Sequence, residues 1–232
     1  MGLGGTRTSV ALPLHDDDLE WVDLALVPTS PNRSRRRTAP REPAASRRSA
    51  GSLFGDPVTR PGPLADVPPG TLGPAMIVWL RHHPLWVRGT GPRILLVDLD
   101  NLRAGPTRWQ ARMEVVVWLS RLADHTVLAG QHSAVDRARP HLAELADAAH
   151  SVDDGSDVAD HVLLDAAEAI LAAKARTAVI SNDGIFVRLA GRGPLTVVSP
   201  GLDALSEKLR DAASRVVDLT AIEEDALVRL QQ

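Results

Sequence analysis

The sequence of 232 residues contains no cysteine and no tyrosine, and aromatic residues make up only 3% of it. The lack of cysteine excludes disulfides, thiolate nucleophiles, and zinc or iron–sulfur sites with cysteine ligands. No apolar run approaches the roughly 20 residues that a membrane helix needs, and no charged start followed by a continuous apolar stretch opens the chain. We therefore expect a soluble, cytoplasmic protein without membrane contact.

Common nucleotide and zinc-protease signatures are also missing from the sequence. It has no Gly-x-Gly-x-x-Gly after a strand, no phosphate loop ending in Gly-Lys-Ser/Thr, and no His-Glu-x-x-His. Nucleotide-driven and zincin chemistry are therefore not expected. The 24 arginines against 2 lysines, together with abundant alanine, suggest a GC-rich bacterial genome.

The chain divides into a basic first part and an acidic second part. Residues 1–92 hold 13 of the 17 prolines and 10 of the 17 glycines, with 11 basic and 8 acidic side chains, whereas residues 93–232 hold 15 basic and 21 acidic ones. Such a density of Pro and Gly does not favour regular structure. We assign four segments: a disordered Pro/Arg-rich tail (1–75), an apolar N-terminal extension (76–91), an α/β domain (92–220) and a C-terminal helix (221–232).

Two stretches of the tail suggest contacts with partners. Seven arginines between positions 33 and 48 lie among Ser, Pro and Ala, so they form either a site for RNA, DNA or an acidic protein, or a basic linker. Residues 14–27 mix acids with large apolar side chains, which is typical of a peptide that folds on a protein partner and equally of a solvated tail. The oligomeric state stays open, with a dimer among the alternatives.

From residue 93 onward, short β-rich runs alternate with helical periods, which is typical of parallel α/β units. We expect strands at 94–97, 126–128, 178–180 and 195–198, with weaker ones at 151–152 and 216–217. Helices are expected at 107–122, 135–149 (interrupted early by Pro140), 157–173, 184–190, 202–213 and 221–230. The predicted fold is a three-layer Rossmann-like domain with a central, mainly parallel sheet.

Acidic residues gather where two of these strands end. Asp98 directly ends the strand 94–97, and Asp183 follows the strand 178–180 after Ser181 and Asn182. Asp160 lies in the first turn of the helix that opens at Asp157. Because the carboxyl ends of parallel strands and the first turns of the following helices share one edge of the sheet, these acids are expected to converge there.

Converging carboxylates repel one another unless a proton or a cation lies between them, and oxygen ligands suit Mg²⁺ or Mn²⁺. One or two such ions support hydrolysis of a phosphodiester. The structural alternatives are a helix cap for Asp157 and an ordinary turn for Asp100 and Asn101. Asp98 and Asp183 favour a function more strongly, since a carboxylate directly after a buried strand is costly to keep without a role.

Three separated motifs resemble, in order, those of the NYN branch of the PIN-like ribonuclease superfamily, over about residues 92–219. Leu96-Val97-Asp98-Leu99-Asp100-Asn101 is similar to the first strand with its Asp-x-x-Asn ending, and Ala159-Asp160-His161-Val162-Leu163-Leu164 to the opening of the central helix. Val179-Ile180-Ser181-Asn182-Asp183-Gly184 is similar to the third motif, a strand running into Ser-Asn-Asp.

The resemblance implies a PIN-like fold and a metal-dependent ribonuclease with water as the nucleophile. It implies that Asp98, Asp160 and Asp183 coordinate Mg²⁺ or Mn²⁺ and that Asn101 orients the first acid or the phosphate. Ser181 and Asn182 would support the loop, and Asp157 is a further supporting acid. Many relatives carry another acid two or four residues after the third Asp, where this chain has Ile185 and Val187.

Two other functions compete with the ribonuclease. Asp98-Leu99-Asp100 is also similar to the Asp-x-Asp of haloacid dehalogenase-type phosphatases, in which Asp98 would be the nucleophile and Asp100 the acid/base. That family usually has Thr where Leu102 stands. The other alternative is a catalytically reduced RNA-binding or protein-interaction module of the same fold, which the apolar Ile185 and Val187 favour.

An acidic domain that binds RNA must still attract a polyanion. Four arginines on predicted loops or early helix turns near the acidic edge are expected to hold backbone phosphates: Arg103, Arg108, Arg188 and Arg192. The sequence thus predicts a basic rim around an acidic, metal-binding centre.

Overall fold

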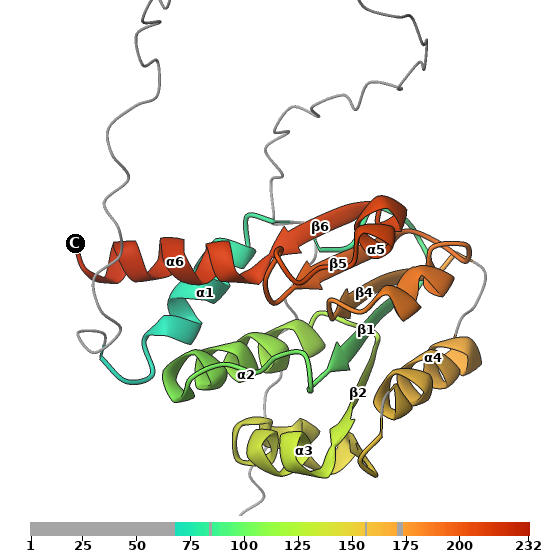
Figure 1. Cartoon of the computed structure of the whole chain (residues 1–232). Coiled ribbons are helices and arrows are strands. Elements are labelled where there is room, and N and C mark those ends of the chain that lie inside the picture. Colours follow the sequence, from blue (N-terminus) through green and yellow to red (C-terminus); the bar gives the residue numbers. More distant parts are fainter. Residues whose placement is uncertain (1–67, 84, 156, 171–173) are drawn as a thin grey trace, which may run out of the picture. The chain divides into compact units, whose positions relative to one another are not determined.

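The computed structural model of the chain describes residues 68–83, 85–155, 157–170 and 174–232 (Figure 1). The arginine-rich stretch and the predicted partner-binding segment 14–27 lie outside these residues. None of the helices in the described part combines the length and the hydrophobicity that crossing a membrane requires.

The described residues form an α/β domain around one sheet of six parallel strands, which confirms the predicted fold class. The strand order is β3-β2-β1-β4-β5-β6. The strands are β1 (Arg93–Asp98), β2 (His125–Gln131), β3 (Ala149–Val152), β4 (Arg176–Ile180), β5 (Leu195–Ser199) and β6 (Arg215–Asp218). The chain winds outward from β1 to β3 and then returns to place β4 beside β1. In this strand order, the loops after β1 and β4 diverge and leave a ligand-binding position between them.

The central strands are apolar because both faces of the sheet are covered. Ile94 and Leu96 of β1 belong to one buried cluster, and Leu95 and Val97 belong to the other. This alternation follows from the two-residue period of a strand, and burial on both faces explains why β1 reads as a continuous apolar run.

Helices complete three layers around the sheet. The cluster with Leu95 and Val97 takes in buried residues of α1 (Leu72–Leu80), α2 (Pro106–Ser120), α3 (His132–Ala138) and α6 (Leu219–Leu230). The cluster with Ile94 and Leu96 takes in those of α4 (Val158–Ile170), η5 (Gly184–Leu189) and α5 (Glu207–Ala212). In Figure 1, α1, α2 and α6 lie together, away from α4.

Most helix boundaries lie within two residues of those predicted, and three segments differ by more. The helix expected over 135–149 ends at Ala138 and is followed by two short 3₁₀ segments, η3 (Arg139–His141) and η4 (Ala143–Ala148), after which Ala149 opens β3. Pro140 explains the break, since proline lacks the amide proton of a helical turn and clashes with the turn before it.

The helix expected over 202–213 covers only Glu207–Ala212. The residues before it are held elsewhere, because the Ser206 amide donates to the carbonyl of Asn182 at 3.0 Å. The third difference is at α1, which begins at Leu72, so residues 72–75 are helical and do not belong to a disordered tail. Leu72, Met76 and Leu80 are buried against α2 and α6 residues.

Candidate metal centre

The ends of β1 and β4 bring the first and third sequence motifs side by side. Val97 pairs with Ile180 in the parallel register, so Asp98 and Ser181 follow as neighbours at the carboxyl edge of the sheet. The Ser181 hydroxyl donates a hydrogen bond to Asp98 Oδ2 at 2.8 Å. The backbone register therefore fixes the distance between the two motifs.

Asp98 is buried and is held by donors on every side. The residue is 2% exposed. Oδ1 accepts from the amides of Asp100 at 3.1 Å and Asn101 at 3.3 Å, and Oδ2 accepts from the Asn101 side chain and from Ser181. Burial raises the pKa of Asp98, and the hydrogen bonds from Ser181 and Asn101 oppose that rise. Since a carboxylate offers about four acceptor positions, the protein itself occupies those of Asp98.

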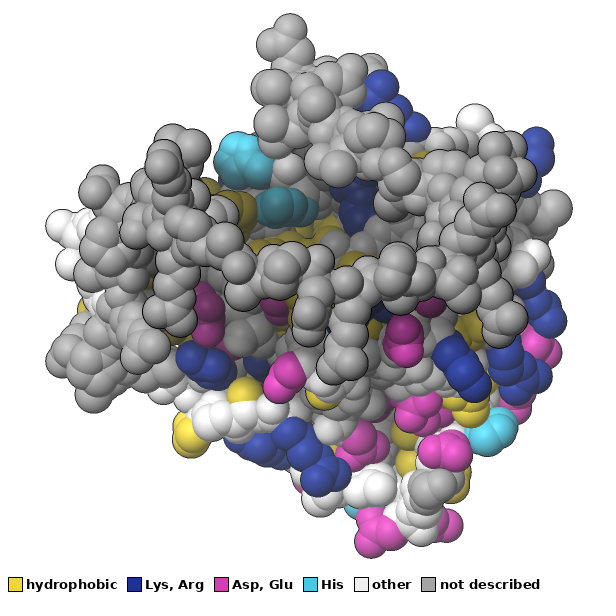
Figure 2. Space-filling model, turned by 45° about the horizontal axis from the view of Figure 1, so that its top comes forward, with side chains coloured by type: hydrophobic (Ala, Val, Ile, Leu, Met, Phe, Trp, Pro, Cys, Tyr) yellow, Lys and Arg dark blue, Asp and Glu magenta, His cyan; other side chains and the backbone are white. Residues whose placement is uncertain are grey.

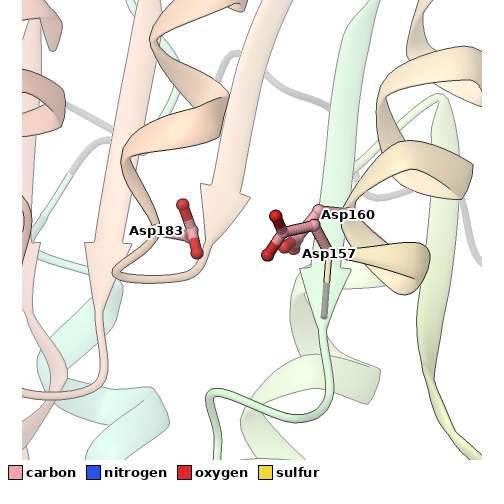
Figure 3. Close-up of side chains that lie close together, drawn as sticks. All are labelled: Asp157, Asp160 and Asp183. Carbon is pink, nitrogen blue, oxygen red and sulfur yellow. The ribbon is translucent and has the colours of Figure 1, made fainter. Parts of the chain in front are cut away.

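Three other carboxylates meet at the same edge (Figure 3). One oxygen each of Asp157, Asp160 and Asp183 lies within 4.8 Å of the other two. Asp157 and Asp160 come from the start of α4 and face Asp183 on the loop after β4. Asp98 does not belong to this set of three carboxylates. It lines a pocket of about 120 Å³ together with Asn101, Asp157 and Asp160.

Local backbone geometry and hydrogen bonds fix the positions of Asp157 and Asp183. Asp157 has a φ of 61°, a left-handed conformation that Asp adopts more readily than most residues. Its carbonyl accepts the His161 amide at 3.0 Å, so the residue is fixed at the start of α4. Asp183 caps η5, because its Oδ1 accepts the Ile185 amide at 2.9 Å.

The electrostatics of the cluster favour a bound cation. Burial, followed by the charges of Asp98, Asp183 and Asp157, raises the pKa of Asp160 from 3.8 to about 7, against a smaller opposing effect of His161. Asp160 is only 8% exposed. A divalent ion would offset this repulsion, and a set of carboxylate oxygens is the donor type that Mg²⁺ and Mn²⁺ prefer. The residues present therefore fit such an ion.

The loop between β4 and η5 is tied to β5. The Ser199 hydroxyl donates to Asn182 Oδ1 at 2.6 Å, and Asn182 Nδ2 donates to the Gly201 carbonyl at 3.2 Å. Ser181 accepts the Asp183 amide at 3.1 Å while it donates to Asp98. Asn182 thus fixes the loop to the end of β5. Ser181 connects the carboxylate of Asp98 to the backbone amide of Asp183.

Sequence reasoning did not foresee the environment of Asp100 or the part played by Gln131. Asp100 Oδ2 accepts the Gln131 amide at 2.9 Å, which joins the loop after β1 to the end of β2. Gln131 also lines the pocket. Its position at the carboxyl end of a strand next to β1 was the signal that could have identified it.

Three of the four arginines of the predicted rim have acidic partners. Arg103 pairs with Asp100 at 3.4 Å, Arg108 with Glu223 at 3.6 Å, and Arg192 with Glu168 at 2.9 Å. Arg188 is exposed on η5. The described surface drawn in Figure 2 mixes basic with acidic side chains.

The two positions where many NYN relatives carry a further acid are part of the apolar core. Ile185 and Val187 are partly buried and pack against the cluster that contains Phe186 and Leu189. These two side chains therefore contribute to the core and offer no oxygen ligand to a metal ion.

No protein-family model and no curated protein matches the chain. Among solved structures, it is similar to a protein of unknown function from Vibrio parahaemolyticus, with 16% identity and a TM-score of 0.35. That match covers 56% of this chain and 95% of the other.

Proposed function

We propose that this protein hydrolyses RNA phosphodiester bonds with the help of Mg²⁺ or Mn²⁺. The observation that carries the proposal is the set of three carboxylates, Asp157, Asp160 and Asp183, whose oxygens lie within 4.8 Å of one another at the carboxyl edge of the sheet. The pKa of Asp160, raised to about 7 by burial and then by repulsion from the neighbouring carboxylates, supports it, because a bound cation offsets both effects.

In this proposal the protein groups have distinct tasks. Asp157, Asp160 and Asp183 hold the ion, and Asp98 adds negative charge behind them while Ser181 and Asn101 keep its carboxylate in place. Mg²⁺ or Mn²⁺ supplies positive charge that attracts a phosphodiester and makes water a better nucleophile at neutral pH. A pocket of about 120 Å³, lined by Asp157 and Asp160 among others, opens beside these carboxylates.

RNA is proposed as the substrate on the strength of the three motifs that resemble the NYN ribonucleases. Arg188 is exposed on the helix that Asp183 caps, where it could contact a backbone phosphate. Arg103 and Arg192 are exposed and held only by surface ion pairs, which exchange easily for phosphate contacts.

A binding module of the same fold is the second candidate, and the packing of Ile185 and Val187 favours it. Without a further acid, the cluster could bind RNA through a cation and leave the bond intact. The phosphatase has less support, because Asp98 is buried and protein donors occupy the acceptor positions of both its carboxylate oxygens, which hinders attack on a phosphate.

The test is cleavage of end-labelled single-stranded RNA by the full chain in Mn²⁺, Mg²⁺ or a chelator. Asp183→Asn removes one ligand, and Asp165→Asn is the matched control, since Asp165 is exposed on α4 and outside the cluster. Metal-dependent cleavage that only Asp183→Asn abolishes is the expected result. RNA binding without cleavage would favour the binding module, and turnover of a phosphomonoester alone would favour the phosphatase.

A further inference from the structure

A buried ion pair lies behind the candidate metal centre and takes no part in the chemistry proposed above. Arg112 of α2 is 4% exposed and Glu223 of α6 is 0% exposed. Arg112 Nε donates to Glu223 Oε1 at 2.5 Å, and Arg112 Nη2 donates to Glu223 Oε2 at 3.3 Å. Arg108 approaches the same Glu223 Oε2 at 3.6 Å. Removing two charges from water is costly, so such a pair is weak evidence for stability and calls for another explanation.

The remaining donors of Arg112 reach two loops whose residues support the centre through Asp98 and Asn182. Nη1 donates to the Leu102 carbonyl at 3.3 Å, and Nη2 also donates to the Pro200 carbonyl at 3.2 Å. Leu102 follows Asn101, which orients Asp98. Pro200 precedes Gly201, whose carbonyl accepts the Asn182 side chain. One guanidinium therefore spans the loops after β1 and β5.

We propose that Arg112, oriented by Glu223, is a positioning residue that holds the loops after β1 and β5 in the register that the metal-binding carboxylates require. This inference rests on the proposed metal centre. The planar guanidinium suits the task because it directs several N–H groups in fixed directions at once, which a lysine ammonium does not. Thr220 of α6 reinforces the arrangement by donating to the Pro200 carbonyl at 2.6 Å.

A double substitution distinguishes this positioning role of Arg112 from a purely structural one. Removing one partner alone leaves a buried charge and destabilises the fold, whereas replacing both by apolar residues of similar size is often neutral. The double variant Arg112→Met/Glu223→Leu is therefore expected to fold with a thermal midpoint near that of the wild type. It still lacks both hydrogen bonds that Arg112 donates, to the Leu102 and Pro200 carbonyls.

The experiment measures Mn²⁺ affinity by titration calorimetry on the full chain, and amide hydrogen exchange over residues 99–103 and 200–206, the loops after β1 and β5, by mass spectrometry. Groups that orient metal ligands change metal affinity by about 10- to 100-fold when lost. We expect the double variant to bind Mn²⁺ at least about tenfold more weakly and to exchange faster in both segments. Arg112→Lys, which keeps the charge paired with Glu223, is expected to show a smaller loss.

Leu227→Ala is the control for general destabilisation, since Leu227 is 1% exposed on α6, one turn beyond Glu223. It should lower the thermal midpoint and leave Mn²⁺ affinity unchanged. Wild-type Mn²⁺ affinity and wild-type exchange in the double variant would overturn the positioning role. If the wild type binds no Mn²⁺, the proposed metal centre is wrong. The exchange rates then still test whether Arg112 positions the two loops. Faster exchange in the double variant supports that role, and unchanged exchange refutes it.

Discussion

Asp160 gives the sharpest test of the electrostatics of the cluster, because its charge costs stability when no cation is bound. Its pKa rises from 3.8 to about 7, first through burial and then through the charges of Asp98, Asp183 and Asp157. At about 1.4 kcal/mol for each tenfold change, full ionisation costs at most about 4 kcal/mol. Solvent at the open side of the pocket screens these charges, so we expect a net cost of about 2 kcal/mol.

The sign of the change in stability with pH follows from the protonation of Asp160 in the folded and in the unfolded chain. Between pH 4 and 7 the folded chain keeps the proton of Asp160 and the unfolded chain has lost it, so stability falls as pH rises through this range. Asp160→Asn removes the cost. We expect the variant to equal the wild type near pH 4 and to exceed it by about 2 kcal/mol at pH 8, or by about 4–8 °C in thermal midpoint.

Urea unfolding in chelator at pH 4.5, 6 and 8 measures the difference, with Asp165→Asn as the exposed control on the same helix. Mn²⁺ should raise the midpoint of the wild type at pH 8 and have less effect on Asp160→Asn, because the variant has lost one ligand. A stability difference that does not change with pH would refute the reasoning about repulsion.

The remaining predictions concern other side chains of the centre. Asp183→Asn is expected to abolish metal-dependent RNA cleavage while the circular dichroism spectrum is retained, and full activity would exclude the metal centre. Asp98→Asn removes the negative charge behind the ion and places an amide group against the donors of Ser181 and Asn101, so it is expected to lower both the cleavage rate and the midpoint of urea unfolding, and wild-type values of both would contradict this role. Ser181→Ala removes a donor to buried Asp98, so urea unfolding should show a loss of about 2 kcal/mol, and an unchanged midpoint would contradict this role. Arg188→Ala should weaken RNA binding and reduce its salt slope by about 1, whereas an unchanged slope would remove Arg188 from the rim.

Much of the fold could be predicted from local patterns. The alternation of apolar strands and helical periods gave the parallel α/β class and located each of the six strands; the four inner strands read as apolar runs because both faces of the sheet are covered there. One boundary was wrong because a contact distant in sequence decided it. The helix expected from 202 starts late because Asn182 holds the Ser206 amide, which no local pattern records.

The sequence likewise predicts one part of the candidate centre, and side-chain packing decides the other. The strand-end acids Asp98 and Asp183 follow from sequence order, since parallel strands present their carboxyl ends on one edge. Which acids share a cation depends on side-chain packing: the left-handed backbone brings Asp157 into the cluster, and four hydrogen bonds hold Asp98 behind it.

The pairing of Arg112 with Glu223, 111 residues further along the chain, shows most clearly what tertiary structure alone decided. On a helix, a charged residue among apolar neighbours is consistent with a solvated face, and the sequence offers no sign that either partner is buried. Their burial is tolerated only when α2, α6 and the loops after β1 and β5 come together, because each charge then finds its counter-ion and Arg112 finds carbonyl acceptors in one place. Composition and periodicity determined the sheet and its acidic edge, whereas the final contacts required the packed chain.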